Sequence, residues 1–323
     1  LLLFGLVLKE YTGGMEVGSL IAFIQYGMQI LFGFLMLAMV FIMIPRAQAS
    51  AIRINEVLEM EPEIIDPKVT KLADKKSGYV DFKDVTFSYP GADQPAISNI
   101  TFSARPGETT AIIGGTGSGK STLINLIPRF YDATSGKILV DGVDVREMSQ
   151  ESLRSKIGFV PQNTVLFTGT IAENIKYGKD NATTEEIQHA ATVAQATDFI
   201  NGMKEGYDHP IAQGGTNVSG GQKQRLSIAR ALVRQPEIYI FDDSFSALDF
   251  KTDAKLRAAL KKETSKSTVI IIAQRVATVM DADRIIVIDD GIIAGMGTHK
   301  ELLTSCKIYH EIVSSQLSEE ELS

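Results

Sequence analysis

A glycine-rich octapeptide in the first half of the chain restricts the possible fold more than any other feature. It reads Gly-Gly-Thr-Gly-Ser-Gly-Lys-Ser over residues 114–121 and follows the apolar run Thr110–Ile113. Apolar residues at helical spacing then follow from Leu123 to Ile127. This order predicts a buried strand, a loop and a helix, which is the context of the P-loop pattern G-x-x-x-x-G-K-[ST]. A simple glycine- and serine-rich turn is the alternative, and the flanking strand and helix argue against it.

The P-loop pattern identifies candidate ligands for a nucleotide. Glycines lack a Cβ, so backbone N–H groups can close around an anion. Lys120 adds a positive charge for the β- and γ-phosphates and is a candidate catalytic residue, while Ser121 is a candidate Mg²⁺ ligand. The predicted nucleotide-binding residues of this segment are Gly114, Gly115, Thr116, Gly117, Ser118, Gly119, Lys120, Ser121 and Thr122.

Strand-like patterns surround the P-loop and indicate two kinds of sheet. Apolar residues alternate at a period of two from Tyr79 to Tyr89, and Pro90-Gly91 ends the run. Further strands of an antiparallel β-subdomain are expected at 97–102 and 137–140, the latter turning at Asp141-Gly142 as a hairpin does. Unbroken apolar runs, typical of parallel strands buried on both faces, occupy 238–241, 268–272 and 285–288.

Two capping boxes predict helix starts in the second half. Thr183 and Glu186 precede an apolar helical pattern over 187–196. Thr298 and Glu301 are expected to start the last helix. Together with the strands, they predict an α/β P-loop domain with a parallel core, an antiparallel β-subdomain and a helical subdomain.

An uncharged segment near the start of the chain predicts a membrane helix. Residues 17–45 contain no charged side chain, although the whole chain has a net charge of −7. As a helix, residues 17–44 would be about 42 Å long, against about 30 Å for the hydrocarbon core of a bilayer. A buried helix of a soluble domain is the alternative. Arg46 and Arg53 follow the segment and weakly favour a cytoplasmic location for what comes after it.

The opening of the chain is apolar and has no initiator Met, so we expect a piece of a longer membrane protein. The expected domains are a transmembrane fragment over 1–60, which contains the end of one helix and then helix 17–44 with a cytoplasmic extension, a linker over 61–78, a nucleotide-binding domain over 79–318 and a tail over 319–323. Gln25 and Gln29 share a helix face, where they either line a substrate cavity or bond to neighbouring helices.

An acidic pair is a candidate metal and catalytic site. Asp242 and Asp243 end the apolar run 238–241, which places them at the carboxyl edge of the sheet, where the P-loop is also expected. Asp242 would hold Mg²⁺ through water. A helix cap is the alternative for such a pair.

A second glycine motif identifies the family. Val218-Ser-Gly-Gly-Gln222 is followed by Lys-Gln-Arg-Leu-Ser-Ile-Ala-Arg-Ala-Leu, and here the chain resembles the ABC ATPases. In that family the signature Ser219, Gly220, Gly221 and Gln222 binds the γ-phosphate of ATP held by another nucleotide-binding domain. The net negative charge argues against nucleic acid as a partner.

The resemblance implies roles for several other residues. Tyr89 would stack on adenine, although an ordinary strand aromatic is the alternative. Gln162 resembles the Q-loop residue that binds nucleotide and Mg²⁺ and faces the membrane domain; an exposed loop amide is the alternative. A D-loop that crosses to the partner is expected, unless it only starts a helix, at Ser246, Ala247, Leu248 and Asp249. Residues 166–175 resemble a stretch of exporter-type half-transporters.

Three positions depart from the usual exporter pattern. Asp243 stands where exporters usually have Glu as general base, and Gln274 stands where they have the switch His. Gln213-Gly-Gly215 replaces Glu-Arg-Gly. The Asp and Gln pair resembles one half of bacterial heterodimeric multidrug exporters, which implies a slow ATP site of this chain with Asp243 and Gln274 as its catalytic residues. The alternative is that Asp243 serves adequately as the base, because side-chain and water adjustments restore its reach.

The expected protein is therefore half of a plasma-membrane, multi-pass exporter with a cytoplasmic nucleotide-binding domain. ATP and Mg²⁺ are the expected cofactors. A second half-transporter, membrane lipid and a transported amphipathic drug, lipid or peptide are the expected partners. Two alternatives remain: a soluble ABC ATPase that acts on DNA or ribosomes, and a regulatory subunit that gates a channel with little hydrolysis.

Overall fold

The computed structural model describes residues 16–71 and 77–316, and its contacts divide the chain into two compact units, Leu1–Glu63 and Ile64–Ser323. The expected end of a preceding helix and the expected tail 319–323 lie outside the described residues. Each unit is described below by itself.

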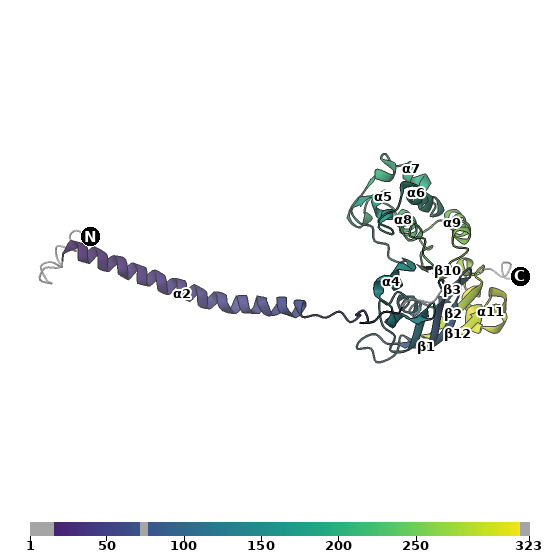
Figure 1. Ribbon diagram of the computed structural model, residues 1–323, viewed down its shortest axis with the longest axis horizontal. Helices are drawn as coiled ribbons and strands as arrows, with labels where there is room; N and C mark the ends of the chain where they lie inside the picture. The colour runs from purple at the N-terminus through teal and green to yellow at the C-terminus, as the bar shows by residue number, and fades with distance from the viewer. Residues whose placement is uncertain (1–15, 72–76, 317–323) are drawn as a thin grey trace. The chain divides into compact units, whose positions relative to one another are not determined.

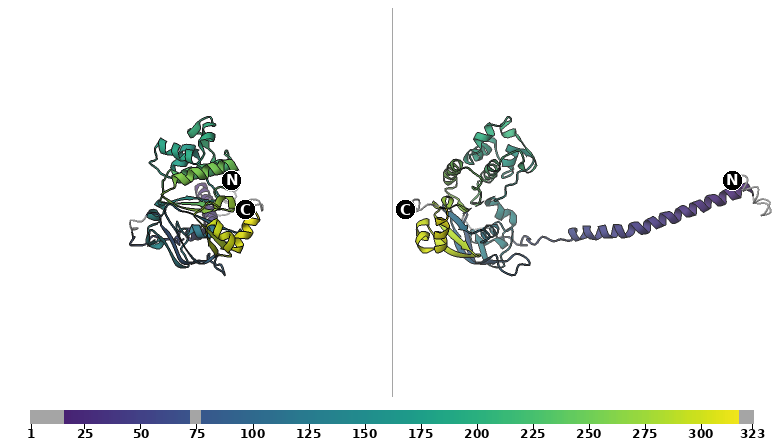
Figure 2. Two further views of the ribbon diagram at one scale, coloured as in Figure 1. Left: turned by 90° about the vertical axis from the view of Figure 1, so that its right-hand side faces the viewer. Right: turned by 180° about the vertical axis from the view of Figure 1, so that it is seen from behind.

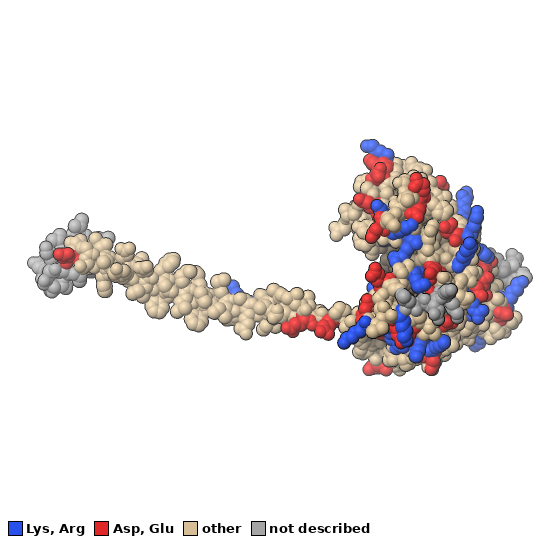
Figure 3. All heavy atoms as spheres, in the orientation of Figure 1, with Lys and Arg blue, Asp and Glu red and all other residues tan. Residues whose placement is uncertain are grey.

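The first unit contains one long helix, α2, over Val17–Leu58 (Figure 1). The predicted segment 17–44 and its extension form this single helix of 42 residues, which continues through Pro45. Within residues 16–71 and 77–316 it is the one helix that is long and apolar enough to cross a membrane. Most of its surface carries no charged side chain (Figure 3).

The second unit contains the predicted antiparallel β-subdomain. Its sheet has the strand order β2-β1-β4-β5, and the strands are β1 Val80–Phe87, β2 Ile97–Ala104, β4 Ser135–Val140 and β5 Val143–Asp144. The predicted hairpin turn at Asp141-Gly142 is confirmed, because both residues have positive φ, 52° and 85°, between β4 and β5.

A six-stranded sheet forms the centre of this unit, in the order β12-β11-β3-β10-β9-β6. Its strands are β3 Thr109–Gly114, β6 Ile157–Val160, β9 Ile238–Asp242, β10 Thr268–Ile272, β11 Arg284–Asp289 and β12 Ile292–Gly297. All neighbours pair in parallel except β11 and β12, which confirms the predicted parallel core. A two-stranded sheet pairs β7 Gly169–Thr170 with β8 Pro210–Ile211.

Helices cover the sheet and form a separate helical part around α5 to α8 (Figures 1 and 2). The α-helices of this unit are α3 Lys120–Asn125, α4 Gln150–Ser155, α5 Ile171–Lys176, α6 Thr184–Val193, α7 Thr197–Asn201, α8 Gly220–Leu232, α9 Phe250–Glu263, α10 Val276–Val279, α11 His299–Ser305 and α12 Lys307–Ser314. Short 3₁₀ turns occupy η1 Val145–Glu147, η2 Gly206–Asp208 and η3 Gln213–Gly215.

Both predicted capping boxes are present, at Thr183 with Glu186 and at Thr298 with Glu301. The prediction that Thr298 starts the last helix is wrong, because α11 ends at Ser305 and α12 follows. Cys306 separates them with an extended backbone (φ −122°, ψ 105°). Its buried side chain packs against Gly295, where an added Cβ would lie 2.9 Å from the sulfur.

Alternating residues of the central strands feed two hydrophobic cores. Ile112, Ile240 and Ile270 face a core shared with the β-subdomain and α3. Ile113 and Phe241 face the other core, which contains α5 to α9 and α12. The central sheet therefore lies between the two hydrophobic cores. The carboxyl ends of its parallel strands form the edge at which the candidate functional site lies.

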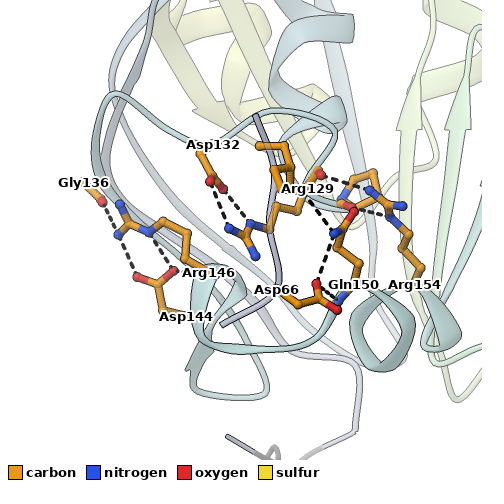
Figure 4. Close-up of polar contacts among 10 residues, drawn as sticks. Asp66, Arg129, Asp132, Gly136, Asp144, Arg146, Gln150 and Arg154 are labelled. Atoms are coloured by element: carbon orange, nitrogen blue, oxygen red, sulfur yellow. Dashed lines mark hydrogen bonds and ion pairs between the residues drawn. The ribbon is translucent and has the colours of Figure 1, made fainter. Parts of the chain in front are cut away.

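The start of the second unit contacts α4 and η1, and Figure 4 shows its Asp66 beside Gln150. Asp66 accepts hydrogen bonds from the Gln150 backbone N at 2.9 Å and its side-chain amide at 3.1 Å, and the backbone hydrogen bond is the main reason that the pKa of Asp66 is lowered. Lys71 pairs with Glu147 at 2.9 Å. Part of the segment expected as a linker is thus fixed to this unit.

Candidate functional site

The P-loop connects β3 to α3, as the sequence predicts. Gly114 closes the strand, and an added Cβ there would lie 2.0 Å from the Ile288 carbonyl oxygen. Gly119 immediately precedes α3 with φ 97°, and its Cβ would lie 2.7 Å from the Ala96 carbonyl oxygen. Only glycine fits these two places without displacing backbone.

Lys120 is buried inside this loop. Its Nζ donates to the Gly114 carbonyl oxygen at 3.0 Å, the Gly115 carbonyl oxygen at 2.5 Å and the Ser118 hydroxyl at 3.3 Å. Burial lowers the pKa of Lys120, and the nearby charges of Asp242 and Asp243 oppose that shift. A cation held by neutral acceptors in a partly desolvated loop is a ready partner for phosphate oxygens.

Asp242 ends β9 directly beside the start of α3. The Ser121 hydroxyl donates to Asp242 Oδ1 over 3.1 Å. Burial raises the pKa of Asp242, the Asp243 charge adds to this, and Ser121 and Lys120 oppose it. Within the described residues no group of three or more His, Cys, Asp or Glu side chains could hold a metal. Adjacent hydroxyl and carboxylate oxygens nevertheless suit Mg²⁺, which keeps water and phosphate among its ligands.

Two glutamine side chains from distant loops, Gln162 and Gln274, meet at Asp243. The side-chain amide of Gln274 donates to Asp243 Oδ2 at 2.9 Å, and that of Gln162 donates to the same oxygen at 3.4 Å. Burial raises the pKa of Asp243, and the largest opposing effect is the hydrogen bond from Gln162. Amides do not titrate near neutral pH, so neither neighbour can take a proton from this carboxyl group.

The backbone of Asp243 is also unusual. Its φ is 44°, a left-handed conformation that Asp tolerates better than most residues. The Asp243 N–H donates to the Ile272 carbonyl oxygen at 3.0 Å, and the Ser246 hydroxyl donates to the Asp243 carbonyl oxygen at 2.9 Å. These bonds hold the left-handed turn between β9 and the D-loop.

Tyr89 lies next to α3, the helix that follows the P-loop. Its hydroxyl and that of Thr122 are hydrogen-bonded at 3.0 Å, and its ring meets the rings of Phe87 and Tyr131 edge-on, with centroids 4.9 and 5.4 Å away. The residue is 37% exposed. The ring is therefore held in place and still accessible to a planar ligand.

The signature forms the start of α8. The Ser219 hydroxyl accepts from Gln222 N at 3.3 Å, and the Gln222 side-chain oxygen accepts from Ser219 N at 2.8 Å, which completes a capping box. Ser219 and Gly220 are exposed. Figure 1 places α8 in the helical part and β3 in the sheet, so the signature is a second surface apart from the P-loop.

The D-loop packs against the signature. An added Cβ at Gly221 would lie 3.1 Å from the Ala247 carbonyl oxygen and 3.5 Å from Leu248. Asp249 caps α9 by accepting from Thr252 N at 3.0 Å, while Ser246 and Ala247 are exposed. Gln213–Gly215, the segment that differs from the usual exporter sequence, forms η3. Lys223 donates to the Gly214 carbonyl oxygen at 2.9 Å.

Sequence reasoning missed Arg275. The charge of this residue opposes the burial that raises the pKa of Asp243. Its guanidinium donates to the Ser246 carbonyl oxygen at 3.2 Å, so it joins the switch position to the D-loop. Its place directly after Gln274 is the signal that could have identified it.

Comparisons with known proteins agree with this geometry. Residues 97–246 match the family described as "ABC transporter". An ABC transporter ATP-binding protein of Mycobacterium tuberculosis is 49% identical over 313 residues, covering 96% of this chain and 53% of the relative. The ATP-dependent lipid A-core flippase of Salmonella typhimurium is 42% identical over 275 residues, covering 85% and 47%. The chain thus spans about half the length of the curated relatives it matches.

A solved structure has a similar fold. The structure of a bacterial Atm1-family ABC exporter with ATP bound superposes with a TM-score of 0.84 at 36% sequence identity, covering 97% of this chain and 55% of that chain. The likeness extends over both the apolar helix and the α/β unit.

Proposed function

The chain carries an ABC transporter ATP-binding domain of the exporter half-transporter type, and from this premise we propose that it drives ATP-dependent export across a membrane. The observation that carries the proposal is that α2, a helix of 42 residues with no charged side chain before Arg46, precedes a complete phosphate-binding loop in one chain. ATP binding by a soluble enzyme would not need such a helix.

In this proposal α2 crosses the plasma membrane as one span of a multi-pass protein, and the ATP-binding domain is cytoplasmic. The exposed apolar surface of α2 requires a nonpolar surrounding. Protease added to sealed right-side-out vesicles should spare the ATP-binding domain. Rapid digestion of the domain would indicate the opposite topology. Recovery of the protein in the soluble fraction after membrane fractionation would favour the soluble ATPase.

At the ATP site, Lys120 and the P-loop N–H groups would hold the phosphates and Tyr89 the adenine. Ser121, Asp242 and Gln162 would hold Mg²⁺, which supplies positive charge to the β- and γ-phosphates. Asp243 would orient the attacking water, but its side chain is one methylene shorter than Glu. Because Gln274 cannot titrate, we infer that this site retains ATP and hydrolyses it slowly.

The exposed signature would act on ATP held by a second half-transporter, and the adjacent D-loop would reach the same partner. A partner with Glu and His at the two altered positions would gain one fast site from this pairing. We therefore propose a heterodimer. A homodimer of this chain would contain two slow sites.

The proposed cargo is an amphipathic molecule such as a lipid, a drug or a peptide. The relative from Salmonella typhimurium is a lipid A-core flippase by name, which favours a lipid. The test is ATP-dependent movement of a fluorescent phospholipid, and separately of an amphipathic dye, by the heterodimer in proteoliposomes. Lys120→Ala in this half and in the corresponding partner lysine provides the inactive control. ATP turnover without movement of either probe would contradict export of these classes.

A regulatory subunit is the second candidate, favoured by the two amides on Asp243. ATP-dependent ion conductance in planar bilayers, without ATP turnover by the assembled pair, would support a channel-gating subunit and exclude the exporter.

A further inference from the structure

Gln316 makes two well-formed hydrogen bonds to the segment that carries Gln274. It lies in the turn after α12, and its side-chain Nε2 donates to the Gln274 carbonyl oxygen at 2.8 Å. Its side-chain Oε1 accepts from the Val276 backbone N at 2.8 Å. One amide group therefore pairs with a C=O and an N–H two residues apart, as a neighbouring strand would.

Both ends of this contact are supported. Tyr309 and Val313 of α12 are fully buried, so the helix that presents Gln316 is firmly packed. Val276 is the first residue of α10, and the preceding residue Arg275 provides no side-chain cap. The Val276 N–H is one of the donors that a helix start leaves without an intrahelical partner, and Gln316 satisfies it.

The same segment reaches the ATP site on its other side. The Gln274 side chain donates to Asp243 Oδ2 at 2.9 Å. Moving the Gln274 backbone would move this amide away from Asp243, and a displacement of about 1 Å at a reacting group can cost about 10² in rate.

We propose that Gln316 is a positioning residue: it fixes the switch-loop backbone so that the Gln274 side chain remains at Asp243. The C-terminal helix thereby becomes part of the support of the ATP site. The catalytic reading of this contact rests on the proposed function of the Asp243–Gln274 site, whereas the clamp on the backbone does not.

The clamp is tested by hydrogen exchange on the intact protein in lipid nanodiscs without nucleotide. Gln316→Ala should speed exchange of the Val276 N–H by about two- to tenfold, as expected for loss of one hydrogen bond. Gln316→Glu keeps the acceptor and should retain most of that protection. Ser315→Ala is the matched control, because the Ser315 hydroxyl donates only to the Ile312 carbonyl oxygen in the same helix.

The coupling is tested by single-turnover ATP hydrolysis at the site of this chain. Gln316→Ala should lower the rate about ten- to a hundredfold and leave the ATP concentration for half-saturation within about twofold, because the phosphate loop is untouched. Gln316→Glu should also lower it, since a carboxylate cannot donate to the Gln274 carbonyl oxygen. In a Gln274→Ala background, Gln316→Ala should change the rate by less than about twofold.

Wild-type exchange at Val276 in Gln316→Ala would overturn the clamp. Faster exchange with an unchanged rate, or a rate loss that multiplies with that of Gln274→Ala, would overturn the positioning role. Failure of the proposed function has a different result: ATP would not bind the wild-type protein, while exchange at Val276 would still respond to Gln316→Ala.

Discussion

Replacing Lys120 with alanine should weaken ATP binding without unfolding the P-loop. The Nζ group is buried and contacts two carbonyl oxygens and a hydroxyl. A phosphate oxygen would replace part of these contacts with a charge-assisted hydrogen bond worth about 1.5 to 3 kcal/mol, or about 10- to 150-fold in Kd. Because neutral hydrogen bonds are given up in exchange, we expect the lower part of that range, about 10- to 30-fold.

The assay is titration of a fluorescent ATP analogue at fixed salt, with and without Mg²⁺. Lys223→Ala is the matched control, because Lys223 also donates to a loop carbonyl oxygen, that of Gly214, but outside the cradle. Its affinity should equal that of the wild type. Equal affinities for the Lys120→Ala and wild-type proteins, with both folded by circular dichroism, would refute the assignment of the phosphate cradle.

Three further predictions concern other parts of the site. Burial raises the pKa of Asp242 in the folded protein above its unfolded value of about 3.9. The carboxyl group therefore favours folding below about pH 3.9 and opposes it once the pH exceeds the raised pKa. Asp242→Asn should raise Tm at pH 7 to 8, and the difference from the wild type should shrink toward pH 4. A Tm difference that does not vary with pH would contradict this. Tyr89→Leu should raise the Kd for ATP about two- to tenfold while Tyr89→Phe changes it little, and equal values for the two would exclude ring stacking. Gly221→Val should crowd Ala247 and slow hydrolysis at the partner's site while leaving ATP affinity of this chain intact, and loss of that affinity would argue against two separate surfaces.

Features set by neighbouring residues could be predicted from the sequence. The strand, loop and helix around Lys120 follow from a short pattern, and so does the hairpin at Asp141-Gly142. The capping boxes at Thr183 and Thr298 are equally local, since each joins residues three apart. Parallel pairing of the central strands follows from their unbroken apolar character.

Features that depend on distant contacts could not be predicted in this way. The break at Cys306 lies where its side chain contacts Gly295 of β12, a contact that no local pattern around Cys306 reveals. Gln316 reaches a carbonyl oxygen 42 residues earlier in the chain. The two amides on Asp243 come from loops 81 and 31 residues away, so the sequence identified the three residues but not their shared oxygen.

The most direct test of the account restores the usual exporter residues at the altered site. Single-turnover ATP hydrolysis should be compared for the wild-type chain and the double variant Asp243→Glu/Gln274→His, each alone and at saturating ATP. General acid–base groups contribute about 10² to 10⁴ in rate, so the account predicts that the double variant hydrolyses ATP at least about tenfold faster. A wild-type chain that alone turns over ATP as fast as the double variant would contradict a slow site that requires an unlike partner.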